Sequence, residues 1–256
     1  MPLYLSVTPP ERKNALRYTR ELANVAYRIG PDSALLRREL PPEVRGGLLS
    51  VSDRDAPRIA APERLCAAVL RECGRRSYRG VVLDFEEAPT PDRRDFARLL
   101  CRQLRNTRRP LFVPEGYSVP GAVTLINTAV SGGSFTQRLQ EARASYGAIA
   151  LDVERLAMDF PLPAVSGEGT AMSRERLRKL MEEEKPAVFF SPELCARYFT
   201  CLRKGMPRFI LFDDADTIRR KLRLGASMGV SAAFVMYPEV EDLLPEIFKG
   251  GNSPGI

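Results

Sequence analysis

The chain alternates strand-like apolar runs with helical patterns almost from end to end. Strands separated by helices of about a dozen residues indicate βα units and a parallel sheet. We count about eight core strands in 256 residues, which is the size of one TIM (β/α)8 barrel. A doubly wound open sheet is the alternative. Against it, no strand leads into a Gly-rich phosphate loop, because residues 131–134 (SGGS) indicate only a plain turn.

The expected elements follow one another with short connections. Strands are expected at 3–7, 24–29, 46–53, 80–87, 110–116, 122–130 and 229–238, with one strand or two in 148–162. Helices are expected at 11–23, 62–76, 91–106, 135–147 and 214–228. Two extra strand-like runs, 186–190 and 208–212, predict a small hairpin insertion before the last strand. We expect one barrel domain over 1–249, a flexible loop at 161–173 and a disordered tail at 250–256.

The chain contains no histidine and no tryptophan. This excludes Ser-His-Asp and Cys-His catalysis and any zinc site that needs imidazole. The five cysteines form no C-x-x-C pair, and Cys66, Cys73 and Cys101 fall in helical patterns typical of small core residues. We therefore expect no metal and no cofactor, so that carboxylates, tyrosines or lysines must move any protons.

The net charge is +7, and only six of the 39 basic residues are lysines. The arginines of 93–109 share their run with an apolar stripe, which is typical of a solvated helix face, so we expect no nucleic-acid partner. A basic surface favours an anionic partner such as a cell-wall polymer. No run is long enough to span a membrane and no signal peptide is evident, so a cytoplasmic or spore-associated protein is expected.

The run RGVVLDFEEAP, residues 79–89, places three acids at the end of a buried strand. Side chains of a strand alternate between its faces, so Asp84 and Glu86 share one face with Val82, while Leu83 and Phe85 share the other. The bulky pair suits the layer under the helices, which puts Asp84 and Glu86 inside the barrel at its catalytic end. Repulsion and burial then raise the proton affinity of one acid. A polar strand end that caps the next helix is the equally weighted alternative.

The stretch RGVVLDFEEAPTPDRRDFARLLCRQLR, residues 79–105, resembles the fourth strand and helix of glycoside hydrolase family 18, whose signature is D-G-x-D-x-D-x-E. Gly80, Asp84 and Glu86 match the signature, whereas Arg79 and Val82 replace its first two aspartates. Residues 205–238 also resemble the family, nearest the branch of spore-germination, cortex-lytic N-acetylglucosaminidases.

The resemblance implies retaining, substrate-assisted hydrolysis of a β-linked N-acetylglucosamine polymer of the peptidoglycan cortex or chitin type. Glu86 would protonate the leaving glycosidic oxygen, and Asp84 would orient the substrate's acetamido group. The acetamido carbonyl would itself be the nucleophile, without a cofactor.

The sequence also departs from the family. Val82 interrupts an inward row of carboxylates, and the sixth-strand run at 124–133 lacks the family's tyrosine. The final-strand tryptophan falls near Met236 or Tyr237, and Tyr237 offers a ring for a sugar. Tyr117 or Tyr4 is a candidate for the missing hydroxyl. These departures favour a second function, a barrel without turnover that binds carbohydrate or serves in a spore or cell envelope.

The remaining acids are weaker candidates. Glu115 ends the expected fifth strand at the same rim and is weighed evenly between substrate contact and plain surface. The acids of 213–216 are expected to cap a helix rather than bind a metal. Asp152, Glu154 and Asp159 alternate along an ambiguous strand and have no assigned role.

Overall fold

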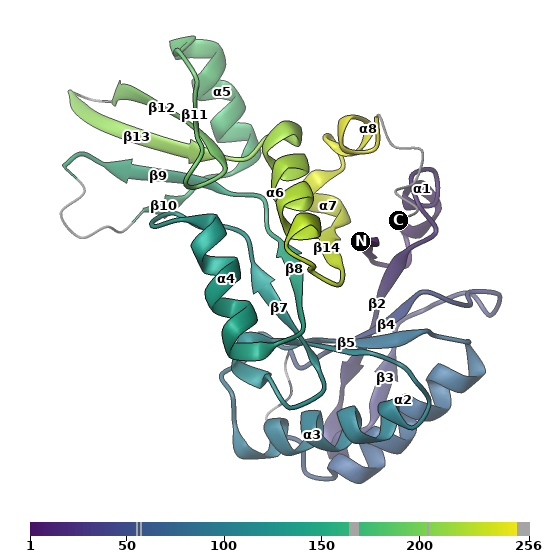
Figure 1. Ribbon diagram of the computed structural model, residues 1–256. Coiled ribbons are helices and arrows are strands. Elements are labelled where there is room, and N and C mark those ends of the chain that lie inside the picture. Colours follow the sequence, from purple (N-terminus) through teal and green to yellow (C-terminus); the bar gives the residue numbers. More distant parts are fainter. Residues whose placement is uncertain (55, 57, 164–168, 204, 250–256) are drawn as a thin grey trace.

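The computed structural model describes residues 1–54, 56, 58–163, 169–203 and 205–249. Within these residues eight parallel strands form a closed barrel, because β1 pairs with β2 on one side and with β14 on the other. The strands are β1 Leu3–Val7, β2 Leu22–Ile29, β4 Leu48–Ser52, β5 Gly80–Asp84, β6 Leu111–Pro114, β7 Val123–Asn127, β8 Ile149–Val153 and β14 Ala233–Met236. The expected TIM barrel is therefore confirmed (Figure 1).

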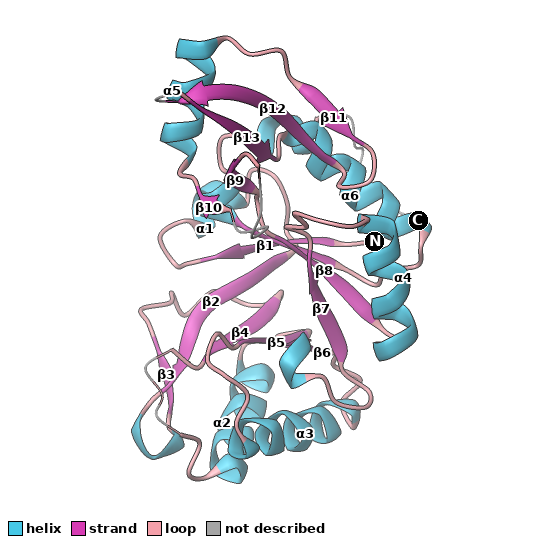
Figure 2. Ribbon diagram, turned by 90° about the vertical axis from the view of Figure 1, so that its left-hand side faces the viewer, coloured by secondary structure: helices cyan, strands magenta, loops and turns pink. Residues whose placement is uncertain are grey.

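Helices cover the outside of this barrel (Figure 2). They are α1 Arg12–Ala15, α2 Pro62–Arg75, α3 Pro91–Arg105, α4 Phe135–Tyr146, α6 Ala215–Ser227, α7 Tyr237–Val240 and α8 Leu244–Ile247, with short 3-10 turns at Pro31–Ser33 and Glu115–Tyr117. The expected helix at 11–23 was wrong beyond its first turn. Leu22 and Ala23 instead begin β2, in register with Leu5 and Ser6 of β1, so pairing between strands overrides the local helical pattern. A short strand, β3 Leu35–Arg37, pairs antiparallel with β2.

An insertion between β8 and α6 carries its own sheet (Figure 2). Its described strands are antiparallel in the order β10-β9-β13-β12-β11, and α5 Arg174–Glu184 covers one face. The strands are β9 Ala157–Pro161, β10 Thr170–Ala171, β11 Phe189–Ser191, β12 Ala196–Arg203 and β13 Met206–Phe212. The two expected strand-like runs fall on β11 and β13, which do not pair with each other in the described sheet; β12, which the sequence did not reveal, lies between them and forms a hairpin with β13. Segment 148–162 forms two strands, whereas 164–168 of the expected loop and the 250–256 tail lie outside the described residues.

The barrel interior is filled by aromatic rings beneath its carboxyl end. Tyr4, Phe112 and Phe234 pack against one another, with ring centroids 5.2 Å apart for Tyr4 and Phe234 and 4.8 Å for Phe112 and Phe234. Val82 belongs to the same interior cluster, whereas Leu83 packs in the outer cluster. The expected division of β5 into an inner and an outer face is confirmed.

A buried ion pair ties the insertion to the barrel. The Lys221 ammonium of α6 lies 2.7 Å from an Asp213 carboxylate oxygen and donates to the Thr128 carbonyl oxygen after β7, at 3.0 Å. Asp213 also accepts from the backbone N–H of Leu156, where the chain enters the insertion. Because the pair is fully buried, these contacts fix the insertion against β7 and β8.

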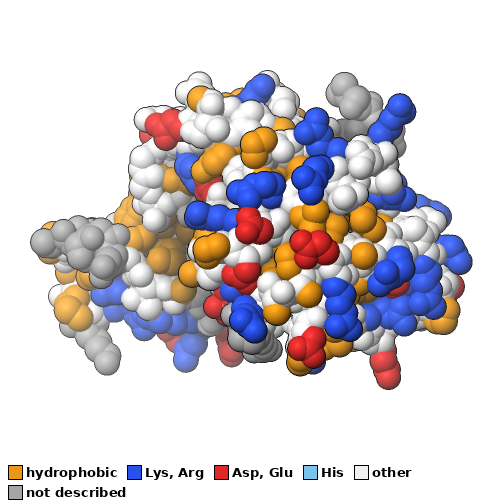
Figure 3. All heavy atoms as spheres, turned by 90° about the horizontal axis from the view of Figure 1, so that it is seen from below, with side chains coloured by type: hydrophobic (Ala, Val, Ile, Leu, Met, Phe, Trp, Pro, Cys, Tyr) orange, Lys and Arg blue, Asp and Glu red, His pale blue; other side chains and the backbone are white. Residues whose placement is uncertain are grey.

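Several smaller expectations concern the cysteines, the acids before α6 and the surface charge. Cys66, Cys73 and Cys101 are buried core residues as expected, and Asp214 caps α6 through a capping box with Thr217. Basic side chains lie among acidic and hydrophobic ones on the face that carries α2 and α3 (Figure 3). No helix in the described part of the chain has the length and hydropathy that crossing a membrane requires.

Candidate active site

Asp84 and Glu86 lie together at the carboxyl end of the fourth barrel strand. Asp84 is the last residue of β5 and is half-buried, and Glu86 follows two residues later and is exposed. Asp84 shares the face of Val82, whose side chain packs inside the barrel, so its carboxyl group points into the mouth above the aromatic rings. Phe85 packs outside against Phe96, which puts the next inward position at Glu86. Glu87 is also exposed and follows on the other face.

The environment of Asp84 favours its protonated form. Burial raises the pKa of its carboxyl to about 6, and the charges of Glu86 and Asp53 add to the effect. A carboxyl group of this kind changes charge between mildly acidic and neutral pH. Next to the exposed Glu86 it gives two carboxyl groups in different environments, the arrangement that acid-base chemistry on a glycosidic bond uses.

The backbone of Glu86 is held by a residue that the sequence did not reveal. Asp53 follows β4, is fully buried, and accepts the Glu86 N–H at 2.9 Å through one carboxylate oxygen. Its other oxygen lies 2.9 Å from Nε of the buried Arg93 on α3. Arg93 in turn donates to the Ala56 carbonyl oxygen at 2.6 Å. The only sequence signal for Asp53 was its place at a strand end.

A second missed acid, Asp152, lies across the mouth. It is near the end of β8, and alternation with the interior residue Ala150 turns it into the barrel. Although the residue as a whole is exposed, burial of its carboxyl group raises the pKa to about 6, and the charges of Asp84, Glu154 and Glu239 add to the effect. Glu154, two residues further along, accepts a hydrogen bond from the side-chain amide of Asn127.

The tyrosines proposed for substrate contact lie away from the pair of Asp84 and Glu86. Tyr117 is buried in the outer core and donates its hydroxyl to the Glu87 carbonyl oxygen at 2.6 Å. Tyr237 is buried in the outer cluster of the other half and donates to Glu241 at 2.9 Å. The Tyr4 ring lies inside the barrel. Burial and the charge of Glu21 raise the pKa of its hydroxyl and Arg79 lowers it, and these two residues precede β2 and β5 at the opposite end of the barrel.

No tyrosine hydroxyl therefore reaches Asp84 through a hydrogen bond within the described residues. Met236, at the end of β14 and in line with the interior Phe234, occupies the inward rim position where the resemblance places an aromatic floor. Glu115 forms an ion pair with Arg138 of α4, which directs it to the outer layer of the rim.

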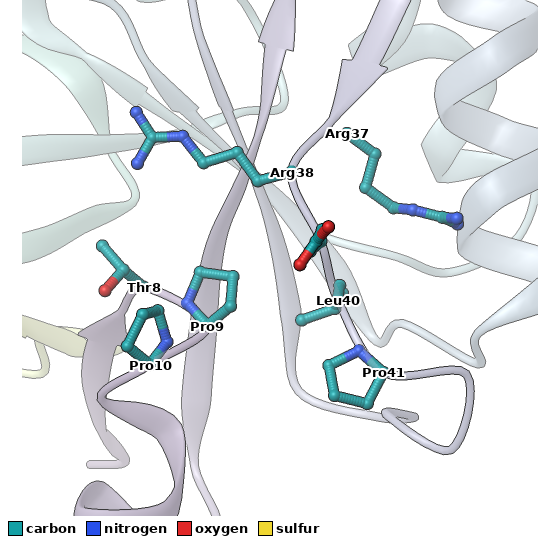
Figure 4. A pocket seen from close by; sticks show the side chains of 8 residues that line it. Thr8, Pro9, Pro10, Arg37, Arg38, Leu40 and Pro41 are labelled. Atoms are coloured by element: carbon teal, nitrogen blue, oxygen red, sulfur yellow. The ribbon is translucent and has the colours of Figure 1, made fainter.

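Two hollows lie near the carboxyl ends of barrel strands. A cavity of about 830 Å³ lies beyond β1 and β3; Thr8, Pro9 and Pro10 form one wall and residues 37–41 form the other (Figure 4). In this view Arg37 and Arg38 extend in opposite directions, and Arg37 pairs with Glu72 of α2. A smaller hollow of about 300 Å³ lies at the ends of β7 and β8 and reaches the insertion at Met158.

Aromatic rings cross the insertion sheet on the face away from α5. The centroid of Phe209 lies 6.2 Å from that of Phe160 and 5.2 Å from that of Tyr198, and Tyr198 lies 5.6 Å from Phe189. Phe189 is 52% exposed at the end of this row, so part of it faces solvent. Met158, which packs with the same cluster, also lines the smaller hollow, so the row adjoins the rim.

Solved structures of spore cortex-lytic enzymes and chitinases have the same fold. The spore cortex-lytic enzyme SleL of Bacillus megaterium QM B1551 is 15% identical with a TM-score of 0.63, over 97% of this chain and 74% of that one. A chitinase from Chromobacterium violaceum ATCC 12472 is 13% identical with a TM-score of 0.69, over 97% of this chain and 98% of that one. A class V chitinase mutant from Cycas revoluta, in complex with (GlcNAc)3, is 10% identical with a TM-score of 0.64 and the same coverage.

At these identities the likeness establishes the fold alone, a barrel shared with solved structures of spore cortex-lytic enzymes and chitinases. The chain matches no protein-family model, and no curated protein matches it in sequence.

Proposed function

We propose that this protein is a glycoside hydrolase that cleaves a β-linked N-acetylglucosamine glycan of the peptidoglycan cortex or chitin type. The observation that carries the proposal is the pair of carboxyl groups at the end of the fourth barrel strand, with Asp84 directed inward and Glu86 at the exposed rim. The pair occupies the catalytic end of a barrel whose fold is shared with cortex-lytic enzymes and chitinases.

In this mechanism Glu86 donates a proton to the leaving glycosidic oxygen. The substrate's own acetamido carbonyl oxygen attacks the anomeric carbon, and Asp84 orients that group and faces the positive charge that develops on it. Asp53 holds the backbone of Glu86 through its 2.9 Å hydrogen bond, so the acid is supported from the neighbouring strand. The cavity beyond β1 and β3 and the hollow at the ends of β7 and β8 offer room for further sugars.

A second candidate is a barrel of the same fold that binds glycan in a spore or cell envelope without turnover. It is favoured by Val82, which removes an inward acid from β5, and by the absence of a tyrosine hydroxyl bonded to Asp84 among the described residues. The partly exposed aromatic row of the insertion offers apolar ring faces for sugar contact in either function.

The two candidates differ in product release. We expect the wild-type protein to release fragments from cortex muropeptides or chito-oligosaccharides, separated by chromatography, and Glu86→Gln to lose this release by at least 100-fold, since general acid catalysis contributes about 10²–10⁴-fold. Glu87→Gln is the matched control, because Glu87 is an exposed neighbour on the other face of the chain. Equal, background-level release by wild type and Glu86→Gln would refute the hydrolase, and glycan binding retained by both would support the second candidate.

A further inference from the structure

Arginine is concentrated on the outer faces of α2 and α3. These helices follow the neighbouring barrel strands β4 and β5, and their inner faces pack together in the outer core cluster (Figure 2). The exposed basic residues of the two helices are Arg64, Arg71, Arg75, Arg94, Arg98, Arg102 and Arg105, and their exposed acids are Glu63 and Asp95. Seven exposed positive charges are therefore set against two negative ones on helices that lie wholly within the described residues.

The arginines of each helix lie in one stripe. Successive exposed arginines are seven and then four residues apart on α2, and four, four and three residues apart on α3. Residues at such spacings lie on the same side of an α-helix. The stripes from Arg64 to Arg75 and from Arg94 to Arg105 are each about 16 Å long at 1.5 Å per residue. We call the two stripes together the α2–α3 basic surface, and Figure 3 shows basic side chains spread over the face that carries these helices.

Acidic side chains neutralise little of the α2–α3 basic surface. Arg98 pairs with Asp95, whereas the other six arginines form no ion pair with an acid in the described part of the chain. On α5, by contrast, all four basic side chains pair with acids. The excess of unpaired positive charge is therefore a local property of α2 and α3 and does not follow from the basic composition alone.

The two stripes are unfavourable in the protein without a partner. Like charges four residues apart on a helix repel each other. Arg64 and Arg94 also lie near the N-terminal ends of their helices, where the helix dipole disfavours positive charge. An anion bound to this surface would offset both effects. Arginine suits phosphate and carboxylate groups, because its planar guanidinium donates two parallel hydrogen bonds to one such group.

The other side chains of these helices restrict the kind of anion. Within α2 and α3, which the structure describes throughout, no large hydrophobic side chain is exposed, so the surface has nothing to insert into the apolar part of a membrane. Neither of these fully described helices has an exposed aromatic ring on which a nucleic-acid base could stack. Two stripes of about 16 Å suit an extended chain whose charges repeat along its length.

We propose that the α2–α3 basic surface binds a linear polyanion with repeated carboxylate or phosphate groups and so attaches the barrel to an anionic polymer. This surface is separate from the pair of Asp84 and Glu86, because the arginines lie on helices outside the barrel and the two acids lie at its carboxyl end. The inference does not rest on the proposed hydrolase, since binding requires no turnover.

Fluorescence anisotropy with labelled poly-L-glutamate and labelled polyphosphate measures the binding between about 50 and 200 mM salt. The double variant Arg71→Gln with Arg102→Gln removes one charge from each stripe. We expect its Kd to rise about tenfold near 150 mM salt and the slope of log Kd against log salt to fall by about 1.4, since each contact with a flexible polyanion contributes about 0.7. Glutamine is a good helix former, so both helices should persist, and circular dichroism checks this.

The matched control is Arg178→Gln with Lys179→Gln on α5. It removes the same two charges from a net charge of +7, at side chains that are 66% and 70% exposed, and its Kd should stay within about twofold of wild type. An equal rise of Kd in both double variants would show that binding follows net charge alone and would overturn the proposal. Failure of wild type to bind either polymer would overturn it as well.

Two further probes test the class of partner. Vesicles with anionic lipid headgroups and duplex DNA should bind more weakly than the better of the two polymers, and tighter binding of either would overturn the assignment to a linear polyanion. Arg75→Gln with Arg94→Gln repeats the test on the same two stripes if the first double variant folds poorly. A protein that binds polymer through these arginines and releases no product would refute the proposed hydrolase alone.

Discussion

The buried pair of Asp53 and Arg93 should be among the most sensitive points of the barrel. The Asp53 carboxylate is fully buried and the Arg93 side chain is 5% exposed, with 2.9 Å between Oδ2 and Nε. Asp53→Asn preserves the shape and can still accept the Glu86 N–H, but it leaves the Arg93 charge buried with only neutral partners. Removing one partner of a buried pair costs about 3–5 kcal/mol, and we expect about 3 kcal/mol because the hydrogen bonds of Arg93 to Ala56 and Thr90 remain.

Urea unfolding monitored by circular dichroism measures this loss. Asp95→Asn is the matched control on the same helix: Asp95 pairs with Arg98, but the side chains are 62% and 66% exposed, so the expected loss is about 0.5 kcal/mol or less. The double variant Asp53→Asn with Arg93→Met should lose less than the two single variants added together, because it leaves no unpaired charge. A loss under about 1 kcal/mol in Asp53→Asn would refute the assignment of the pair as a main support of the Glu86 loop.

Two further predictions concern Asp84 and Tyr4. The pKa of Asp84 is raised from 3.8 to about 6 in the folded protein, so its contribution to stability is fully present below about pH 4 and is lost as the pH rises through 6. Asp84→Asn should therefore gain stability relative to wild type between pH 4 and pH 7. A pH-independent difference in the urea midpoints of the two proteins would contradict this. Tyr4→Phe should leave product release and its pH profile unchanged, because Tyr4 is the second residue of β1, near the end of the barrel opposite to Asp84. A tenfold fall in kcat with unchanged stability would show that the hydroxyl serves the site.

The barrel could be predicted from the sequence because each of its strands has a local signal. Runs such as those of β1 and β6 are apolar, short and bounded by proline or charged residues, and the long helices α2 and α3 have clear apolar faces. The alternation in β5 was strong enough to place Leu83 outside and Asp84 inside. The helix expected at 11–23 was wrong because the pairing of Leu22 with Leu5 is a contact between strands, which local periodicity does not encode.

The site could be predicted only where its residues are close in sequence. Asp84 and Glu86 are two residues apart, so one strand rule placed both. Asp53 and Arg93 are separated by 40 residues, and only the folded barrel brings them together. The hydroxyl directions of Tyr117 and Tyr237 depend on packing against Glu87 and Glu241, which residue type alone does not reveal.

Closure of the barrel by its first and last strands has a consequence for synthesis of the chain. β1 pairs Leu3 with Ala233, so its second neighbour is made only after some 230 residues have left the ribosome. Until then β1 and β8 both present open edges, which are templates for pairing with other chains. Contacts of such long sequence separation form late and slowly. A nascent chain that stalls before β14 is therefore an aggregation hazard, and shielding by a chaperone during translation should matter more for this protein than for one whose barrel closes through local contacts.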